Sequence, residues 1–421
     1  MKSFPALVLG LLAVAACGAF AAEKGPEVKP SLPPDPAILA TITDLGENCS
    51  ALLPAVKTAG SMENPEVRKF KLNKTGPRPR DYCLKWVWAA DRKRALFCGA
   101  NAGVPHRFND VWEYDLASNT WVLLWNPDPD TNKTRRMKPE EKKAFLASFA
   151  DVRDGVLMTK RGAPFDPVHT WWALTYDPEI KALLWVMGHQ NKVGYKFKSG
   201  RPHGHMRLWL FDPQKIEWEF NRAKTYPLGA NASILEYVPD LKGSLWYSFG
   251  RKQMQIFGSA DKKWKPLMDK KALLAAAEIP GSEAICAYDS DEKVLVVHHG
   301  GGTHRGKPVS KKTFNYDVKA GKWSKVIDSG EGPYGYDMKA PMVYDSIAKR
   351  CFIVEKDALW SYAVGEKKWT KLTPRGPELK SRRAFMACYN PEHNVLMADS
   401  GAGQVWIYRH SRRAKSDGGR H

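Results

Sequence analysis

The sequence predicts an all-β fold built from repeated four-stranded antiparallel units, and three observations support this prediction. Trp218 and Trp264 are 46 residues apart, Trp323 follows 59 residues later, and the next interval, to Trp369, is again 46. An aromatic residue followed by aspartate precedes several of the tryptophans, as in YDLASNTW, FDPQKIEW and YDVKAGKW. Six pairs of apolar segments are each joined by a tight turn. A repeat of about 45–50 residues with strands inside it is typical of a β-propeller blade.

The six units are defined by the hairpins of their first two strands. These are WVWAADRKRALFCGA, LTYDPEIKALLWVMGH, EYVPDLKGSLWYSFG, CAYDSDEKVLVVHHGGG, MVYDSIAKRCFIVE and ACYNPEHNVLMADSG. Their turns carry Asp or Asn, whose side chains accept hydrogen bonds from the turn backbone. We expect the aromatic-Asp pair to end the third strand and to cap the next turn in the same way. The tryptophan begins the fourth, outer strand, where its ring can be buried between adjacent blades.

This pattern resembles the kelch family of β-propellers, as in the central domain of galactose oxidase, over residues 67–410. The resemblance rests on the spacing from aromatic-Asp to Trp and on the glycines that end the second strands, which are Gly99, Gly188, Gly250, Gly300 and Gly401. The Gly-Gly doublet of that family stands only at 300–301, and the fifth unit, FIVEKDAL, has none. The resemblance implies a closed ring of blades with binding loops on its faces.

The sixth unit ends after QVWIYRHSRR without an outer strand, so an N-terminal strand is expected to close the ring and remove the open edge. RKFKLNKTGP at 68–77 resembles KKWTKLTPRGP at 367–377. We therefore predict that residues 67–73 form the closing strand.

Three segments are expected outside the blades. Residues 23–66 are rich in proline and then helical through AILATITDLGENCSALLPAV. A helical insertion is predicted at about 137–156, between blades one and two, from KPEEKKAFLASFADVRDG. A hidden seventh blade is the alternative there, although no strand pair is visible. Residues 411–421 form a basic tail.

The N-terminus predicts export to the periplasm, the cell envelope or the outside of the cell. Residues 1–22 contain one lysine, an apolar run and the small-residue pattern of a signal peptide. VAAC, ending at Cys17, resembles a lipobox, so a lipid anchor is the alternative to a free mature protein. The six later cysteines contain no CxxC pair, and five lie in apolar stretches that favour buried free thiols.

The charge predicts an acidic partner. The chain carries 65 Lys and Arg against 45 Asp and Glu, a formal charge of +20. An exported protein this basic is attracted to acidic glycans, cell-wall polymers or lipid head groups, although a solvated basic surface is the plain alternative. Nucleic acid is not expected, because the chain is exported.

Loops joining the second and third strands share a face with the connections between blades, and the long loops all fall there. Function usually lies on such loops. Arginines suit carboxylate, sulfate or phosphate, and those flanking the closure point should be neighbours. The candidate ligand-binding residues are Arg78, Arg80, Arg201, Arg305, Arg382, Arg383, His169 and Trp171. The structural alternative is that these arginines hold the loops in place by hydrogen bonds to backbone carbonyl groups.

Histidines gather in the same loops. Imidazoles from several blades can chelate a transition metal, and the candidate ligands are His106, His203, His205 and His304. The expectation without metal is that these histidines are solvated or hydrogen-bonded and that the protein has no cofactor.

The leading hypothesis is a monomeric, non-catalytic propeller whose cationic, loop-rich face binds an anionic glycan or a partner protein. The alternative is a sugar-active envelope enzyme on the same face. It would resemble a sialic acid epimerase or, less readily, a copper oxidase, for which no Tyr/Cys cross-link pair can be matched. A purely structural role in an envelope assembly is the third hypothesis. No HExxH, GxSxG or P-loop motif is present.

Overall fold

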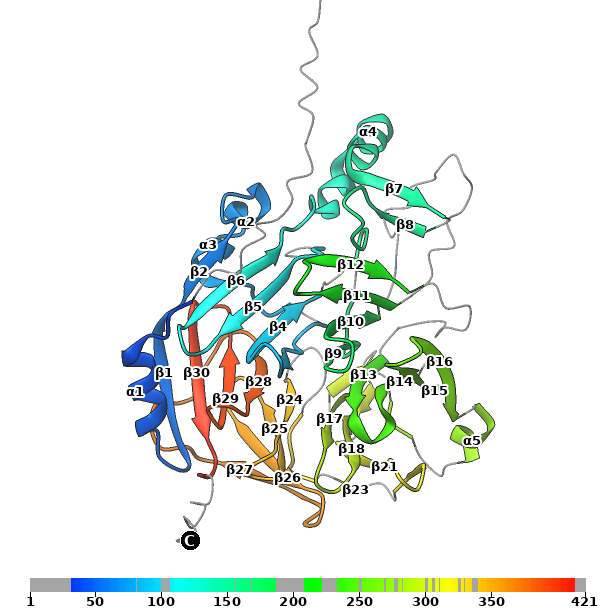
Figure 1. The fold of residues 1–421 in the computed structure, drawn as a ribbon. Helices are drawn as coiled ribbons and strands as arrows, with labels where there is room; N and C mark the ends of the chain where they lie inside the picture. The colour runs from blue at the N-terminus through cyan, green and yellow to red at the C-terminus, as the bar shows by residue number, and fades with distance from the viewer. Residues whose placement is uncertain are drawn as a thin grey trace, which may run out of the picture.

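The computed structural model describes residues 32–412, except for 81, 100–106, 155, 168, 187–207, 222–232, 250–251, 269, 276–278, 282, 300–301, 305–306, 310, 325–326, 329 and 335–339. Within this part of the chain, six antiparallel sheets are arranged around a common centre (Figure 1). The predicted all-β, six-bladed propeller is therefore confirmed.

Each blade runs from an innermost to an outermost strand. Blade 1 contains β3 (Val87–Ala89), β4 (Arg94–Cys98), β5 (Val111–Asp115) and β6 (Thr120–Trp125). Blade 2 contains β9 (Leu174–Asp177), β10 (Ala182–Val186), β11 (Leu208–Asp212) and β12 (Glu217–Phe220). Blade 3 contains β13 (Ser233–Val238), β14 (Gly243–Ser248), β15 (Gln253–Gly258) and β16 (Lys263–Met268).

Blade 4 contains β17 (Ile285–Asp289), β18 (Val294–His299) and β21 (Lys312–Asp317), with β22 (Lys322–Trp323) and β23 (Ile327–Asp328) both paired to β21. Blade 5 contains β24 (Met342–Asp345), β25 (Arg350–Val354), β26 (Leu359–Ala363) and β27 (Lys368–Leu372). Blade 6 contains β28 (Met386–Asn390), β29 (Val395–Asp399) and β30 (Gln404–Arg409). The innermost strands contact one another around the whole ring, in the order β3, β9, β13, β17, β24, β28 and back to β3.

The inner hairpins share one turn geometry that the sequence specifies. Asp289 Oδ1 accepts hydrogen bonds from the backbone N–H groups of Asp291 and Glu292, both at 3.0 Å. Such a side-chain cap stabilises the reversal of the chain. A residue with positive φ then leads into the second strand of each blade, and these residues are Lys93, Lys181, Lys242, Lys293, Lys349 and Asn394. The predicted capping role of the turn acids is confirmed.

Tryptophans of the outer strands lie between blades, as predicted. Trp121 of blade 1 donates its Nε1–H to Asp399 of blade 6 at 3.2 Å. Trp369 of blade 5 donates to Thr313 Oγ1 of blade 4 at 2.8 Å. Each indole thus buries apolar area and also ties its blade to the preceding one.

The ring is closed by a different N-terminal segment from the one expected. Strand β1 (Cys49–Ala55) pairs antiparallel with β30 and completes blade 6. Residues 67–73, predicted to be this strand, instead lie in the short helices α2 (Pro65–Lys69) and α3 (Leu72–Thr75) and in the turn between them. The prediction of closure by the N-terminus is confirmed, and the assignment of the strand was wrong.

Local signals explain this difference. Asn64 caps α2 by accepting from the N–H groups of Glu66 and Val67, and Pro65 occupies the first helical position. Asn-Pro therefore starts a helix where the match to the 367–377 segment suggested a strand. The helical prediction for the N-terminal segment holds for α1 (Pro36–Asp44) and fails for β1.

Other elements lie around the ring. Strand β2 (Lys57–Gly60) adds in parallel to β6 at the outer edge of blade 1. Between blades 1 and 2 come η1 (Thr131–Arg136) and α4 (Pro139–Phe149). The predicted helical insertion is therefore confirmed as far as Phe149, whereas the end of the predicted range, from Ala150 on, is not helical. A hairpin of β7 (Ala150–Arg153) and β8 (Val156–Thr159) follows as a separate two-stranded sheet, and not as a seventh blade. The remaining short elements are η2 (Pro239–Leu241), α5 (Lys270–Ala275), β19 (Gly302–His304) and β20 (Lys307–Val309).

All six cysteines beyond the N-terminal region are free thiols, and only Cys49 is not fully buried. Burial raises the pKa of the Cys98, Cys286 and Cys351 thiols well above the ordinary value, which keeps them protonated. The predicted buried free thiols are confirmed. Among the described residues, no helix has the length and apolar character needed to cross a bilayer.

The closing strand offers a direct test, because neighbouring leucines face opposite ways. Leu53 is completely buried, whereas Leu52 is 48% exposed. We expect Leu53→Ala to lower the free energy of unfolding by about 2–5 kcal/mol and Leu52→Ala by less than about 1 kcal/mol. Chemical denaturation with a single cooperative transition measures both. Equal effects of the two substitutions would show that β1 does not pack as described.

Candidate functional site

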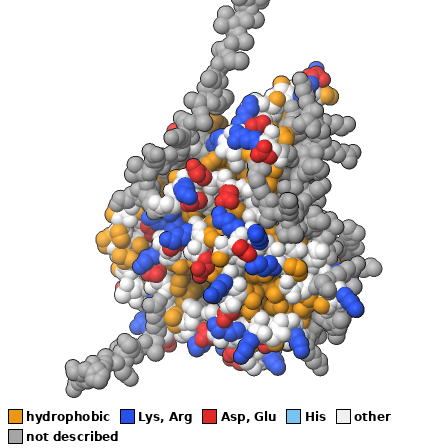
Figure 2. Space-filling view, turned by 45° about the vertical axis from the view of Figure 1, so that its right-hand side comes forward, with side chains coloured by type: hydrophobic (Ala, Val, Ile, Leu, Met, Phe, Trp, Pro, Cys, Tyr) orange, Lys and Arg blue, Asp and Glu red, His pale blue; other side chains and the backbone are white. Residues whose placement is uncertain are grey.

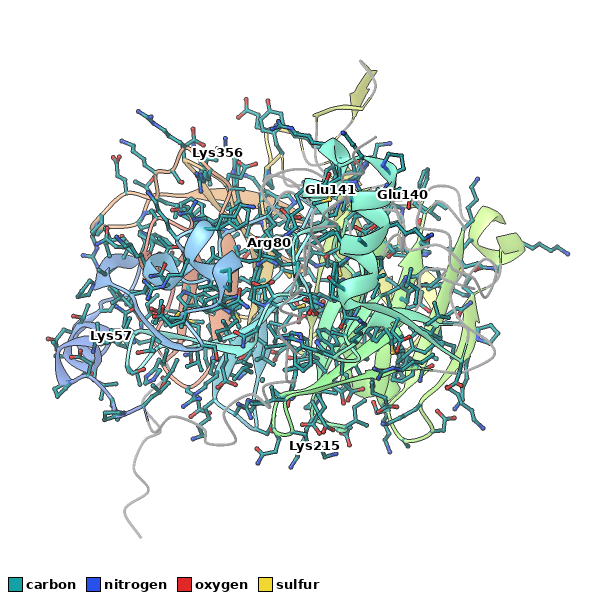
Figure 3. All side chains as sticks on the ribbon, turned by 90° about the horizontal axis from the view of Figure 1, so that it is seen from above. Lys57, Arg80, Glu140, Glu141, Lys215 and Lys356 are labelled. Carbon is teal, nitrogen blue, oxygen red and sulfur yellow. The ribbon has the colours of Figure 1, made fainter. Side chains whose placement is uncertain are left out.

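The predicted division of loops between the two faces is visible from the side. In Figure 3, Lys356 of the β25–β26 loop and Glu140 and Glu141 of α4 lie toward one side of the ring, and Lys215 of the β11–β12 turn lies on the opposite side. Loops between second and third strands therefore share a face with the blade-to-blade connections. We call this side the loop-rich face.

Two of the predicted arginines lie on this face within electrostatic range of each other. Arg78 leads into β3 of blade 1, and Arg383 leads into β28 of blade 6. Burial and the positive charge of Arg383 lower the pKa of the Arg78 guanidinium from its ordinary value. A Cβ at Gly401 (φ +72°) would lie 2.9 Å from Arg78 Cγ, so only glycine lets the Arg78 segment pack over the β29–β30 loop.

These arginines have no acidic partner in the described part of the chain. Within it, neither Arg78 nor Arg383 forms an ion pair, and the buried Nε of Arg78 has no hydrogen-bond partner. Two neighbouring cations repel each other, so an anion placed between them would relieve repulsion and gain charge-assisted hydrogen bonds. Arg382, beside Arg383, is also exposed and also forms no ion pair with a described residue.

Three aromatic rings gather in the connections that lead into blades 1 and 2. The ring centroids of Tyr82 and His169 are 4.7 Å apart, and those of His169 and Trp171 are 4.9 Å apart. All three residues have positive φ, at 61°, 38° and 49°. Such backbone costs about 1–3 kcal/mol for each residue and clusters at functional sites. Arg78, Tyr82, His169, Trp171 and Arg383 define what we call the mouth cluster.

Two contacts span the ring between blades that do not adjoin each other. Lys85, which precedes β3, donates to Leu235 O of blade 3 at 2.6 Å and pairs with Glu236. Trp172, which precedes β9, donates its Nε1–H to Cys286 O of blade 4 at 2.8 Å. Both contacts join blades that are not neighbours.

Arg80 does not belong to this exposed group, contrary to expectation. Its side chain is completely buried and makes two bonds to Asp110, at 2.8 and 2.7 Å. Trp112 Nε1 also donates to Asp110, at 2.7 Å. Arg80 therefore has the structural role that was the alternative for these arginines, and burial removes it from any ligand.

Several predicted residues lie outside the described part of the chain. They are Arg201, Arg305, His106, His203 and His205. The backbone of His304 ends β19. Among the described residues, no group of three or more His, Cys, Asp and Glu could hold a metal ion. The transition-metal site remains a prediction.

Two buried polar contacts that attach the insertion to blade 1 were not expected. Arg107 pairs with Asp166 at 2.8 Å, and Asn109 Nδ2 donates to Asp128 Oδ2 at 2.7 Å. The four residues lie far apart along the chain, in runs without a repeating pattern, so only the fold brings them together. Tyr82 was also missed; its position between Arg80 and a run leading into a strand was the available signal.

Comparisons with known proteins add little. No protein-family model matches the chain, and no curated protein is similar to it in sequence. A solved structure with a related shape is TolB from Acinetobacter baumannii, at 12% identity and a TM-score of 0.37. The match covers 71% of this chain and 56% of the TolB chain. It is too distant to support an argument about function.

A buried acid beneath the mouth cluster should make stability depend on pH. Asp399 accepts from the Gly401 N–H at 2.6 Å, and burial raises its pKa from 3.8 to about 7. The folded state therefore keeps a proton that the unfolded state has lost, and stability falls as pH rises from about 4 to about 7. Asp399→Asn should remove this loss and exceed wild-type stability at about pH 8 by up to about 4 kcal/mol.

Urea denaturation of both proteins at several pH values measures the difference. Asp261→Asn is the control, because Asp261 is exposed. The ion pair with Lys265 lowers the pKa of Asp261 from its ordinary value, which is the opposite of the shift at Asp399. A stability difference between wild type and Asp399→Asn that does not change with pH would contradict the assignment.

Proposed function

We propose that this protein is an exported, kelch-like propeller that binds an anionic glycan on its loop-rich face without catalysing a reaction. The single observation that carries the proposal is the adjacent pair Arg78 and Arg383, which has no acidic partner among the described residues. Guanidinium groups bind carboxylate and sulfate through two parallel hydrogen bonds. The N-terminal signal pattern supports a location in the periplasm, the envelope or outside the cell.

The aromatic part of the mouth cluster supports a sugar as the ligand. Tyr82 and Trp171 stand beside His169, with centroids of Tyr82 and Trp171 5.9 Å apart. Trp171 is 8% exposed, and its Nε1–H has no hydrogen-bond partner in the described part of the chain. Because Trp171 is buried, its ring supports the other two, and Tyr82 and His169, which are both partly exposed, are the rings that a sugar could contact.

The arginine pair accounts better than the total charge of the chain for selective binding of an anionic glycan. On the face shown in Figure 2, the described Lys and Arg side chains (blue) are scattered among Asp and Glu (red). Interspersed charges screen one another, so they attract polyanions weakly. Two adjacent arginines without an acid between them form the stronger local attraction.

The proposal predicts that polygalacturonate binds at low ionic strength and that neutral dextran does not. Arg78→Gln and Arg383→Gln should each weaken binding about 10-fold, because each removes a charge-assisted hydrogen bond. Isothermal titration calorimetry at two salt concentrations measures this, and affinity should fall with added salt.

Lys215→Gln is the matched control, since Lys215 is a cation on the opposite face, 69% exposed along its side chain (Figure 3). Absence of polygalacturonate binding at low salt would end the proposal. Equal losses in the Arg383 and Lys215 variants would assign binding to total charge and not to the mouth cluster.

A further inference from the structure

Tyr334 is presented to solvent in a way that the fold does not require. It lies between β23 and β24, in the connection from blade 4 to blade 5, on the loop-rich face. It is 57% exposed, and in the described part of the chain the only other large hydrophobic residue with such exposure is Leu52, at 48%. Leu52 lies on the outermost strand of blade 6, where exposure follows from its edge position.

Side chains from two other elements hold the Tyr334 loop. Glu355, which follows β25, accepts the backbone N–H of Tyr334 at 2.7 Å and the indole N–H of Trp360 at 2.9 Å. Lys311, which precedes β21, donates to Gly332 O at 2.8 Å. The Lys311 Nζ also lies 3.8 Å from the centroid of the Tyr334 ring. One face of the ring thus carries a cation, while most of the residue remains open to solvent.

A third anchor reaches the loop from the core. His298 is completely buried and bonds to Pro333 O through Nε2 at 3.1 Å and to Thr313 Oγ1 through Nδ1 at 3.0 Å. Trp369 Nε1 donates to the same Thr313 oxygen at 2.8 Å. The hydroxyl of Thr313 then donates to Nδ1, which leaves the Nε2–H for Pro333. Three consecutive residues, 332–334, are therefore each fixed by a different strand or loop.

Residues 332–334, held by Lys311, His298 and Glu355, form what we call the Tyr334 platform. Backbone contacts connect this platform to the mouth cluster. Lys356, labelled on the loop-rich face in Figure 3, accepts the Ser381 N–H at its carbonyl at 3.0 Å. Ser381 Oγ in turn accepts the N–H of Arg383 at 3.1 Å. The charge of Arg383 lowers the pKa of Arg78, whose Cγ lies against Gly401 of blade 6. The face therefore runs from an aromatic ring at blade 5, through arginines at blade 6, to aromatic rings at blades 1 and 2.

We propose that Tyr334 is a stacking subsite for a sugar ring, and that the anionic glycan is a chain long enough to reach from the mouth cluster to Tyr334. This inference rests on the proposed function. The C–H face of a pyranose packs on an aromatic ring, and fixing that ring in advance lowers the entropy cost of binding. Lys311 and Lys356 supply cations for the carboxylate or sulfate groups of the residues stacked there.

The test uses oligogalacturonates of increasing length, with neutral malto-oligosaccharides of equal length as controls. Affinity of the wild type should rise with chain length and then level off once both ends of the face are occupied. Tyr334→Ala should weaken binding of the long oligomers about 3- to 10-fold and leave the shortest bound oligomer unchanged. Tyr334→Phe keeps the ring and should bind like the wild type. Leu52→Ala removes an exposed apolar side chain on the outermost strand of blade 6 and should have no effect.

The outcomes separate the two proposals. If the wild type binds no oligogalacturonate of any length, the proposed function fails and the subsite fails with it. If the wild type binds but Tyr334→Ala matches it at every length, only the subsite is wrong. Loss of binding to short and long oligomers alike in Tyr334→Ala, with an unchanged melting temperature, would also contradict a separate subsite.

Discussion

Closure of the ring is the constraint on which the rest of the structure depends. Every blade buries both faces against its neighbours, so the first and last blades are stable only if they meet. The pairing of β1 with β30 provides this contact, and it is reinforced on both sides. Ser50 N donates to Arg375 O at 2.8 Å, and Arg409 Nη2 donates to Ile42 O at 2.9 Å. The N-terminal segment is thereby held by blades 5 and 6 together.

The mouth cluster is a consequence of this closure. Arg78 follows the closing strand in the chain, whereas Arg383 belongs to the last blade-to-blade connection. They are 305 residues apart in sequence and become neighbours only because the ends of the chain join. A like-charge pair at such a junction opposes folding, and it is tolerated because the adjoining sheets hold their backbones by many hydrogen bonds.

A second set of contacts repeats around the ring. Tyrosines of the innermost strands bond to an acid in the turn of the preceding blade: Tyr344 Oη donates to Asp291 at 2.8 Å, and Tyr288 bonds to Asp240. The exception comes before the closing blade, where Ile347 stands in place of the acid. Tyr389 there donates to Asn394 of its own turn at 2.8 Å instead.

At the junction between blades 6 and 1, Trp88 stands where the innermost strands of the other blades have the bonding tyrosine. Lys93 of blade 1 pairs there with Glu392 of blade 6 at 3.0 Å. The repeat therefore breaks on both sides of blade 6. Closure there relies on β1 and on the Trp121–Asp399 bond in place of the tyrosine contact.

What the sequence could predict follows from the same distinction between repeated and single features. The blades, the turn acids and the buried tryptophans occur several times each, so aligning the repeats with one another makes each assignment more certain. The closing strand occurs once, and CSALLPA has neither the turn nor the tryptophan that marks the other outer strands. Arg80 fails for a related reason. Its partner Asp110 is 30 residues away, and nothing in PRPRDY distinguishes the buried arginine from the exposed Arg78.

The anchoring of Tyr334 shows how the blade core and the binding face are joined. His298 lies in the apolar interface between blades 4 and 5, and its ring centroid is 5.2 Å from that of Trp369. Burial lowers the pKa of His298 from 6.5 to about 3, so the ring stays neutral and keeps one N–H for Pro333 and one acceptor for Thr313. A core group that cannot ionise near neutral pH thus fixes an exposed loop, and the geometry of that loop does not depend on proton binding. The rigidity of the Tyr334 platform therefore originates in the same packing between blades that holds the ring together.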